Sequence, residues 1–269
     1  MRVVVCAMAK NEHLYINDWV KHYLKIGFDK IYIYDNDDED KPYIGDYIDE
    51  KCLKSVEIIN IRGQKGKQLQ HDIYTKFYRT HRFEWCLFCD IDEFLSGVSN
   101  IHTFLELPQF KYANQIRVKW RLFGDDDKIT RDMSKPVYSC FHKVITSSLR
   151  NDLVNKNTLE NQAKSIVRGH LPNVVFHSVH FACFFDNDHI IPSVLPSGKP
   201  SWSRVDIKEN YLFESVFLNH YMTKSLSEFI NQKLNRNDAV FNVSLKMNYY
   251  WRINKKTPEK LEYLKKLGL

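Results

Sequence analysis

Apolar and polar positions along the first 110 residues predict strands and helices in turn. Residues 2–7 form an apolar run, and residues 16–24 carry apolar side chains at i, i+3, i+4, i+7 and i+8. The run is typical of a buried strand, and the spacing is typical of an amphipathic helix. Further strands are predicted over 30–34, 55–61 and 85–90, with a second helix through Leu69, Ile73 and Phe77. This alternation predicts an α/β fold with a doubly wound, mostly parallel sheet.

The pattern changes after residue 110 and predicts a mixed second half. A strand is expected over 115–122, followed by a polar stretch over 151–164 and a β-rich run over 174–185. Ser225 and Glu228 have the spacing of a capping box, which predicts the start of a late helix.

The last residues predict one more helix and complete a single domain. Thr257 and Pro258 suit a helix N-cap and its first turn, and Gly268 suits its end. We expect one domain over 1–269, made of a first half (1–110), a second half (111–250) and a basic C-terminal helix (251–269).

Composition excludes several classes of protein. With 43% hydrophobic and 27% charged residues, the chain is typical of a globular protein and not of a disordered one. It has only 9 glycines and contains neither a G-x-G-x-x-G nor a G-x-x-x-x-G-K-[ST] motif, which argues against dinucleotide and P-loop sites.

The net charge of +6 is concentrated near the C-terminus, where residues 252–269 hold six basic and two acidic side chains. A basic segment favours an anionic partner: nucleic acid, a phosphorylated substrate or an anionic lipid surface. Nucleic acid is not expected, because no known binding motif is present and the other basic residues are spread along the chain. A solvated basic helix is the other interpretation.

The N-terminus and the cysteines predict a cytoplasmic protein. Residues 2–7 are interpreted as a first strand and not as a signal peptide, and no apolar run approaches the roughly 20 residues that span a bilayer. The six cysteines lie mostly in apolar, strand-like segments, so we expect reduced thiols. Cys86 and Cys89 would point to opposite faces of a strand, which argues against a zinc site. Any membrane contact would be peripheral.

The strongest chemical signal is Cys89-Asp90-Ile91-Asp92-Glu93, at the end of an apolar strand. On a continuing strand Asp90 and Asp92 would share one face, at the carboxyl edge where open parallel sheets bind ligands. Paired carboxylates there suit Mg²⁺ or Mn²⁺ shared with substrate phosphates. The alternative is a strand that leaves the core through acidic turn residues.

Eight segments in order give the chain a family resemblance. They are Lys10-Asn11-Glu12 with the helix containing Trp19, residues 34–36, 70–74, 85–94, 120–124, 164–168, 177–180 and 220–229. On these segments the sequence resembles GT-A-fold glycosyltransferases, in particular family 92 and its bacterial relatives. The acidic run after Asn36 and the three aspartates after Gly124 depart from the usual pattern.

The resemblance implies a UDP-sugar donor whose diphosphate is bridged by Mn²⁺ or Mg²⁺. Asp92 would contact the metal, and Asp90 would hold the ribose or a metal-bound water. The donor-binding set would further comprise Lys10, Asn11, Glu12, Asp35, Asn36 and Gln70. For Asp35 and Asn36 an ordinary turn is an equal alternative. The first half, 1–110, would bind the nucleotide sugar, and 111–250 would bind the acceptor.

Histidine and basic residues in the matching segments would complete the donor site. His180 is expected as the additional metal ligand, with His220, Tyr221 and Lys224 nearer the diphosphate. Lys164 and Arg168 would neutralise phosphate, and surface cations without a ligand are the alternative for both.

An inverting transferase also needs a general base to take the proton of the acceptor hydroxyl. Asp125, next to the aromatic segment 120–124, is the expected base. Asp186 and Asp188 are alternatives, and a solvated loop is the interpretation without chemistry.

Together these features predict a metal-dependent inverting glycosyltransferase that uses a UDP-sugar, with galactose as the first expectation. The acceptor would be a glycan or lipid-linked glycan in bacterial cell-surface polysaccharide or lipooligosaccharide synthesis. The enzyme would work in the cytoplasm, with its basic tail on the anionic inner membrane. The alternatives are an inactive nucleotide- or sugar-binding protein on the same scaffold and a sugar nucleotidyltransferase, although Lys10-Asn11-Glu12 is not the glycine-rich loop of the latter.

Overall fold

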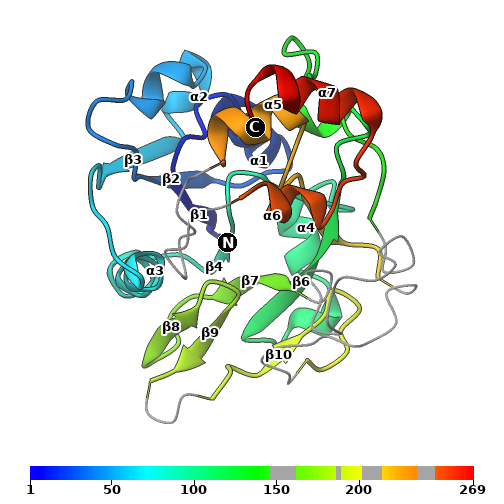
Figure 1. Cartoon of the computed structure of the whole chain (residues 1–269). Coiled ribbons are helices and arrows are strands. Elements are labelled where there is room, and N and C mark those ends of the chain that lie inside the picture. Colours follow the sequence, from blue (N-terminus) through cyan, green and yellow to red (C-terminus); the bar gives the residue numbers. More distant parts are fainter. Residues whose placement is uncertain (146–161, 186–188, 202–213, 235–245) are drawn as a thin grey trace.

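A nine-stranded sheet forms the centre of the computed structural model, which describes residues 1–145, 162–185, 189–201, 214–234 and 246–269. The strands of this sheet are β1 (Val3–Ala9), β2 (Lys30–Asp35), β3 (Val56–Asn60), β4 (Trp85–Phe88), β5 (Glu93–Ser96), β6 (Gln115–Leu122), β7 (Ala163–Arg168), β10 (Ser193–Val194) and β11 (Phe217–His220). Their order is β3-β2-β1-β4-β7-β6-β11-β5, with β10 beside β6. Figure 1 labels β1 to β4, β6, β7 and β10 of this sheet.

The direction of the strands separates a parallel first half from a mixed second half. β3, β2, β1 and β4 are parallel, and so are β6 and β11. β7 runs antiparallel between β4 and β6, and β5 runs antiparallel to β11. The predicted fold class is therefore confirmed. Strands from 1–110 and 111–250 join one sheet, while the assignment of the two halves to donor and acceptor stays a prediction.

Helix α1 (Ile16–Lys25) covers one face of the sheet, as its apolar spacing predicts. Ile16, Trp19, Val20 and Tyr23 are buried and join the same core cluster as alternate residues of β1. The helix is followed by Gly27, whose φ of 96° is easily adopted only by glycine. This turn leads the chain from the end of α1 into β2.

The other face of the sheet is covered by α3 (Leu69–Thr80) and by the hairpin of β8 (Val174–Ser178) and β9 (Phe181–Phe184). The predicted helix through Leu69 is confirmed. The β-rich run predicted over 174–185 is confirmed, and it forms a two-stranded hairpin.

The helices of the C-terminal part form a separate apolar cluster. α5 (Leu226–Gln232), α6 (Met247–Trp251) and α7 (Pro258–Lys266) pack together through Leu226, Phe229, Tyr250 and Leu264. Of these helices, α5 lies beside the start of α1, where the Tyr15 hydroxyl donates to Glu228 (Figure 1). The predicted capping box at Ser225 and the predicted cap at Thr257 are both confirmed.

The remaining elements are short: η1 (Ile44–Tyr47), α2 (Glu50–Leu53), α4 (Ile101–Leu105), η2 (Pro108–Phe110) and η3 (Val137–Ser139). The polar stretch 151–164 falls outside the described residues up to 161, and Ala163 opens β7. Within the described ranges, no helix has both the length and the apolar character that a membrane crossing requires.

Candidate active site

The candidate site lies where the chain turns between β4 and β5, at the carboxyl edge of the parallel strands. Residues of α1 hold this turn: the Trp19 indole donates to the carbonyls of Asp90 and Glu93, each at 3.1 Å. The Tyr23 hydroxyl donates to the Glu93 carbonyl at 3.0 Å. Because β4 already ends at Phe88, the prediction that Asp90 extends the strand and shares one strand face with Asp92 was wrong.

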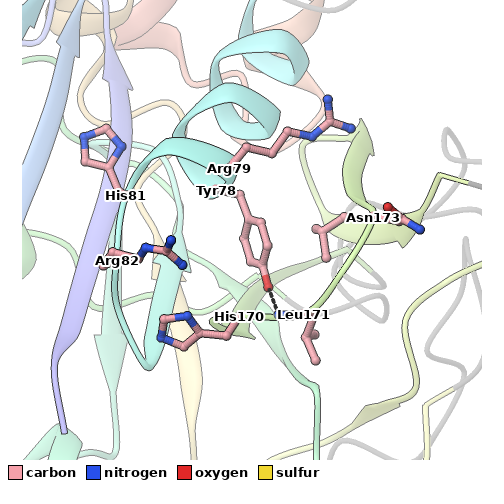
Figure 2. A pocket seen from close by; sticks show the side chains of 8 residues that line it. Tyr78, Arg79, His81, Arg82, His170, Leu171 and Asn173 are labelled. Carbon is pink, nitrogen blue, oxygen red and sulfur yellow. Dashed lines mark hydrogen bonds between the residues drawn. The ribbon is translucent and has the colours of Figure 1, made fainter.

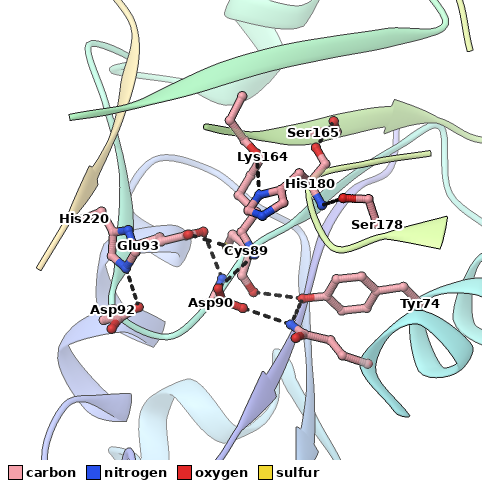
Figure 3. A network of polar contacts seen from close by, with 12 residues as sticks. Tyr74, Cys89, Asp90, Asp92, Glu93, Lys164, Ser165, Ser178, His180 and His220 are labelled. Carbon is pink, nitrogen blue, oxygen red and sulfur yellow. Dashed lines mark hydrogen bonds and ion pairs between the residues drawn. The ribbon is translucent and has the colours of Figure 1, made fainter. Parts of the chain in front are cut away.

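Asp90 faces α3 and the start of β7 (Figure 3). Its carboxylate accepts hydrogen bonds from Gln70 Nε2 at 2.9 Å and from Lys164 Nζ at 2.8 Å. Burial alone would raise the pKa of Asp90, but the Lys164 ammonium and these two hydrogen bonds hold it below its usual value. The Asp90 side chain is still 35% exposed, so it remains accessible to a ligand.

Lys164 and Glu93 form the floor beneath Asp90. Both side chains are fully buried, and the Lys164 ammonium lies 3.9 Å from Glu93 Oε1. Burial raises the pKa of Glu93 well above its usual value, and the positive charge of Lys164 offsets this only in part. The Lys164 ammonium thus pairs with protein carboxylates. That it also neutralises phosphate, as the sequence suggests, stays a prediction.

Asp92 points to the opposite side, toward β11 and α5. Its Oδ1 lies 3.3 Å from His220 Nε2, and its Oδ2 accepts from Lys233 Nζ at 2.5 Å. Lys224 Nζ lies 3.7 Å from the same Oδ2. Burial would raise the pKa of Asp92, but Lys233, His220 and Lys224 hold it well below its usual value. Asp92 is therefore a buried carboxylate enclosed by two ammonium groups and an imidazole.

Helix α5 supplies two of these cations, one from each end. Lys224 precedes the N-cap Ser225, and Lys233 is the C-cap. The Glu228 carboxylate anchors the helix, because it accepts from the Ser225 amide at 3.1 Å and from Arg131 Nε at 2.6 Å. The Tyr15 hydroxyl donates to it at 3.0 Å. This network fixes α5 relative to α1 and so places both lysines.

Lys224 is a buried cation without a hydrogen-bond acceptor among the described residues. Its side chain is 3% exposed, and its ammonium lies 3.8 Å from Glu12 and 4.0 Å above the Tyr15 ring. Its φ of 56° lies in the left-handed region that side chains rarely adopt. Burial lowers the pKa of Lys224, and Glu12 offsets the effect in part. Such an ammonium is suited to an anionic ligand.

The pair of Asp92 and His220 fits a divalent ion. Their facing donor atoms are 3.3 Å apart, and neighbouring ligands about 2.1 Å from one octahedral ion are separated by about 3 Å. The described residues contain no group of three or more His, Cys, Asp and Glu side chains that suits a metal. Mg²⁺ is usually held by one or two carboxylates together with substrate phosphates and water. The site thus fits an ion that binds together with a diphosphate.

His180 lies near Asp90, but its ring is engaged elsewhere. Its Nδ1 is 3.1 Å from the Ala163 carbonyl, and its ring packs against Trp120. Burial, together with the nearby Lys164 ammonium, lowers the pKa of His180 to about 3. Its role as a metal ligand stays a prediction, and the geometry favours His220 for that role.

Lys10, Asn11 and Glu12 lie at the same edge, just after β1. The Lys10 ammonium is 3.2 Å from Asp38, and the Asn11 amide donates to Asp37. The Glu12 carbonyl accepts from the amides of the first turn of α1. These contacts link the ends of β1 and β2, and of the three residues Glu12 reaches toward Lys224.

Asp35 is the last residue of β2, and Asn36, which follows it, contacts the segment after β3. The Asn36 side-chain amide donates to the carbonyls of Ile61 and Gln64, at 3.2 and 2.9 Å. Asp35 is fully buried, accepts from the Asp37 amide at 3.1 Å, and has its pKa raised by burial. These contacts favour the turn interpretation for both residues, and their nucleoside role stays a prediction.

Asp125 is enclosed by the C-terminal helices. Its carboxylate lies 2.5 Å from Lys260 Nζ and accepts from the Tyr250 hydroxyl and from the Asp127 amide. Its own amide donates to Asn254. The role of Asp125 as general base stays a prediction, whereas these contacts favour a structural role. The alternatives Asp186 and Asp188 lie outside the described residues.

Arg168 lies at the opposite edge of the sheet. It pairs with Trp85 at the start of β4, because β7 is antiparallel to β4, and its guanidinium donates to the carbonyls of Ala113 and Phe110. The expected contact of Arg168 with phosphate beside Asp90 was therefore wrong. A pocket of about 270 Å³ lies nearby, at the C-terminal end of α3, and Figure 2 shows Tyr78, Arg82 and His170 around it. It is separate from the acidic turn.

Two residues of the site were missed by the sequence analysis. Lys233 is four positions after Phe229 and seven after Leu226, so it falls on the apolar face of α5. A lysine on such a face is a signal for a buried charge with a partner. Glu93 is followed directly by apolar residues on β5, which is the same kind of signal.

The carboxyl edge of the parallel strands, where open α/β sheets bind ligands, thus brings together carboxylates, an imidazole and a buried ammonium that lacks a hydrogen-bond acceptor in the described part of the chain. The sequence profile of glycosyltransferase family 92 matches residues 1–248. The chain therefore belongs to glycosyltransferase family 92. No curated protein sequence matches it.

Solved structures with a detectable likeness include proteins from two organisms. A fragment of TarS from S. aureus in complex with UDP has a TM-score of 0.39 and 12% identity, and the match covers 62% of this chain and 47% of that one. Mannosyl-3-phosphoglycerate synthase from Rubrobacter xylanophilus has a TM-score of 0.31 and 10% identity, over 62% and 53% of the two chains. The chain thus spans about half the length of these structures.

Proposed function

We propose that this protein is a metal-dependent, inverting glycosyltransferase that transfers a sugar from a UDP-sugar to a hydroxyl of a glycan or lipid-linked glycan. Galactose is the first donor sugar to test. The observation that carries the proposal is the pairing of Asp92 with His220 beside Lys224, a buried ammonium for which the described ranges contain no hydrogen-bond acceptor. Membership of glycosyltransferase family 92 supports the reaction class.

The residues of this edge would divide the work on the donor between them. Asp92 and His220 would hold Mn²⁺ or Mg²⁺, which acts as a Lewis acid on the departing diphosphate. Lys224 would donate to a diphosphate oxygen, a charge-assisted contact in a site from which water is largely excluded. Asp90, the more accessible acid, would accept from the ribose or from bound water, with Gln70 fixing its orientation.

Transfer with inversion also requires a base on the side of the acceptor. Asp125 is the general base that the sequence suggests. Substitution of Asp125 tests this role, because it separates a loss of transfer from a loss of stability. The donor sugar and the acceptor are selected by residues around the nucleotide site. Both are therefore to be identified by assay.

The cellular place of the reaction is part of the proposal. We place the enzyme in bacterial cell-surface polysaccharide or lipooligosaccharide synthesis, at the cytoplasmic face of an anionic membrane. Lys265 and Lys266 are exposed at the end of α7, while Lys260 is buried against Asp125. Replacing both exposed lysines by glutamate should reduce sedimentation with anionic vesicles, and unchanged sedimentation would remove the membrane contact from the proposal.

The test is release of UDP from a panel of UDP-sugars, with and without Mn²⁺. The matched variants are Asp92→Asn and Asp132→Asn, since Asp132 is an exposed acid paired with Lys135 outside the site. Mn²⁺-dependent release that Asp92→Asn abolishes and Asp132→Asn preserves would support the proposal and identify the donor. Binding of UDP and Mn²⁺ without any turnover, even with added acceptors, would instead indicate an inactive binding protein. No binding of either would overturn the proposal.

A further inference from the structure

The Lys233 ammonium occupies the position beside Asp92 that a cation would take. Lys233 Nζ donates to Asp92 Oδ2 at 2.5 Å and to the Met222 carbonyl at 2.7 Å. The Lys233 side chain is only 9% exposed, and the Asp92 side chain 6%. A buried carboxylate needs such a partner, because its charge would otherwise be left unpaired.

The charges around Asp92 oppose the entry of a second cation. Lys233 and Lys224 both approach the same oxygen, at 2.5 and 3.7 Å, and His220 faces the other oxygen. A divalent ion arriving alone would meet two ammonium groups. Among the residues that the structure describes, Asp92 is the one carboxylate that lies near both of them. A diphosphate brings the negative charge that makes the ion and the lysines compatible.

The position of Lys233 in the chain suits a group that can exchange partners. It is the C-cap of α5, and the anchor formed by Glu228, Arg131 and Tyr15 holds the opposite end of the helix. Lys233 can therefore turn from Asp92 toward a diphosphate while the capping box stays in place. Its long, rotatable side chain requires no movement of the sheet.

We propose that Lys233 is a positioning residue that competes with the divalent ion for Asp92 and thereby makes binding of the ion depend on the nucleotide. The inference rests on the proposed function. When nucleotide and ion are both bound, Lys233 transfers its hydrogen bond from Asp92 to a diphosphate oxygen. By linkage, the ion tightens nucleotide binding by the same factor as the nucleotide tightens ion binding.

The test is Mn²⁺ affinity of the full chain, measured by electron paramagnetic resonance of free Mn²⁺, with and without UDP. Lys233→Met removes the competing charge and should tighten Mn²⁺ binding in the absence of UDP by about tenfold or more. The factor by which UDP tightens Mn²⁺ binding should fall correspondingly. Lys233→Arg keeps the positive charge and should bind Mn²⁺ as weakly as the wild type.

Lys260→Met is the matched control, because Lys260 is also a buried lysine paired with an aspartate, away from Asp92. It should leave Mn²⁺ affinity unchanged even though it lowers the Tm. Lys233→Gln, a neutral hydrogen-bond donor, replaces Lys233→Met if the latter does not fold, and the same tightening is expected.

Two results would overturn the inference, and they are distinguishable from each other. If the wild type binds Mn²⁺ with UDP but the neutral Lys233 variants bind Mn²⁺ no more tightly than the wild type, the competition is refuted and the proposed function stands. If the wild type binds no Mn²⁺ even with UDP, the proposed function and the inference both fail.

Discussion

The substitution Asp125→Asn separates a structural role of Asp125 from a catalytic one. Asparagine is nearly isosteric and can keep one of the two accepted hydrogen bonds, because the Tyr250 hydroxyl and the Asp127 amide donate to different carboxylate oxygens and the side-chain amide has a single acceptor oxygen. It removes the negative charge that lies 2.5 Å from Lys260 Nζ. The variant therefore tests the ion pair that fastens α7 to the sheet edge.

The magnitude follows from the surroundings of Lys260. Removing one partner of a buried ion pair costs about 3–5 kcal/mol. Lys260 is fully buried but keeps the Lys255 carbonyl at 3.1 Å and Asp127 at 3.4 Å, so we expect the lower end of that range. About 3 kcal/mol corresponds to a fall in Tm of roughly 6–12 °C for a domain of this size.

Thermal unfolding followed by circular dichroism measures the effect, alongside sugar transfer well below the Tm. Asp127→Asn is the matched control: it lies in the same loop, but its side chain is 42% exposed, so a loss of about 0–1 kcal/mol is expected. A structural Asp125 gives a lower Tm with transfer preserved. An unchanged Tm together with a loss of transfer of about a hundredfold or more would refute this reasoning and make Asp125 the base.

Three further predictions concern the donor site. Lys224→Met should weaken UDP binding about tenfold to a hundredfold in a calorimetric titration, because one charge-assisted hydrogen bond is lost; unchanged affinity would exclude Lys224 from the site. His220→Ala should weaken Mn²⁺ binding in the presence of UDP by about tenfold or more, and His180→Ala should leave it nearly unchanged. A larger loss of Mn²⁺ affinity in His180→Ala than in His220→Ala would make His180 the metal ligand. The free energy of unfolding, from urea titrations, should fall as the pH falls from about 6.5 toward about 3. In this range the unfolded chain binds a proton at His180, whereas the folded chain, in which the pKa of His180 is about 3, does not. His180→Gln should reduce the dependence of the free energy of unfolding on pH.

The local pattern of the sequence was enough to predict most elements of the sheet. The strand over 115–122, the helix with Trp19 and the capping box at Ser225 all depend on spacing within one segment. The parallel direction of the first strands follows from their connection by helices. For this reason the carboxyl edge, and with it the neighbourhood of Asp90 and Asp92, could be placed from the sequence.

Only the tertiary structure decided which charges meet at that edge. Lys233 and Asp92 are 141 positions apart, and Asp125 and Tyr250 are 125 apart, so no local pattern relates them. Arg168 illustrates the same limit, since the antiparallel direction of β7 carries it to the far edge while Lys164 stays beside Asp90. Secondary structure depends on interactions between near neighbours in the chain. A buried charge needs a partner of opposite charge, and that partner is set by the packing of segments that are distant in the sequence.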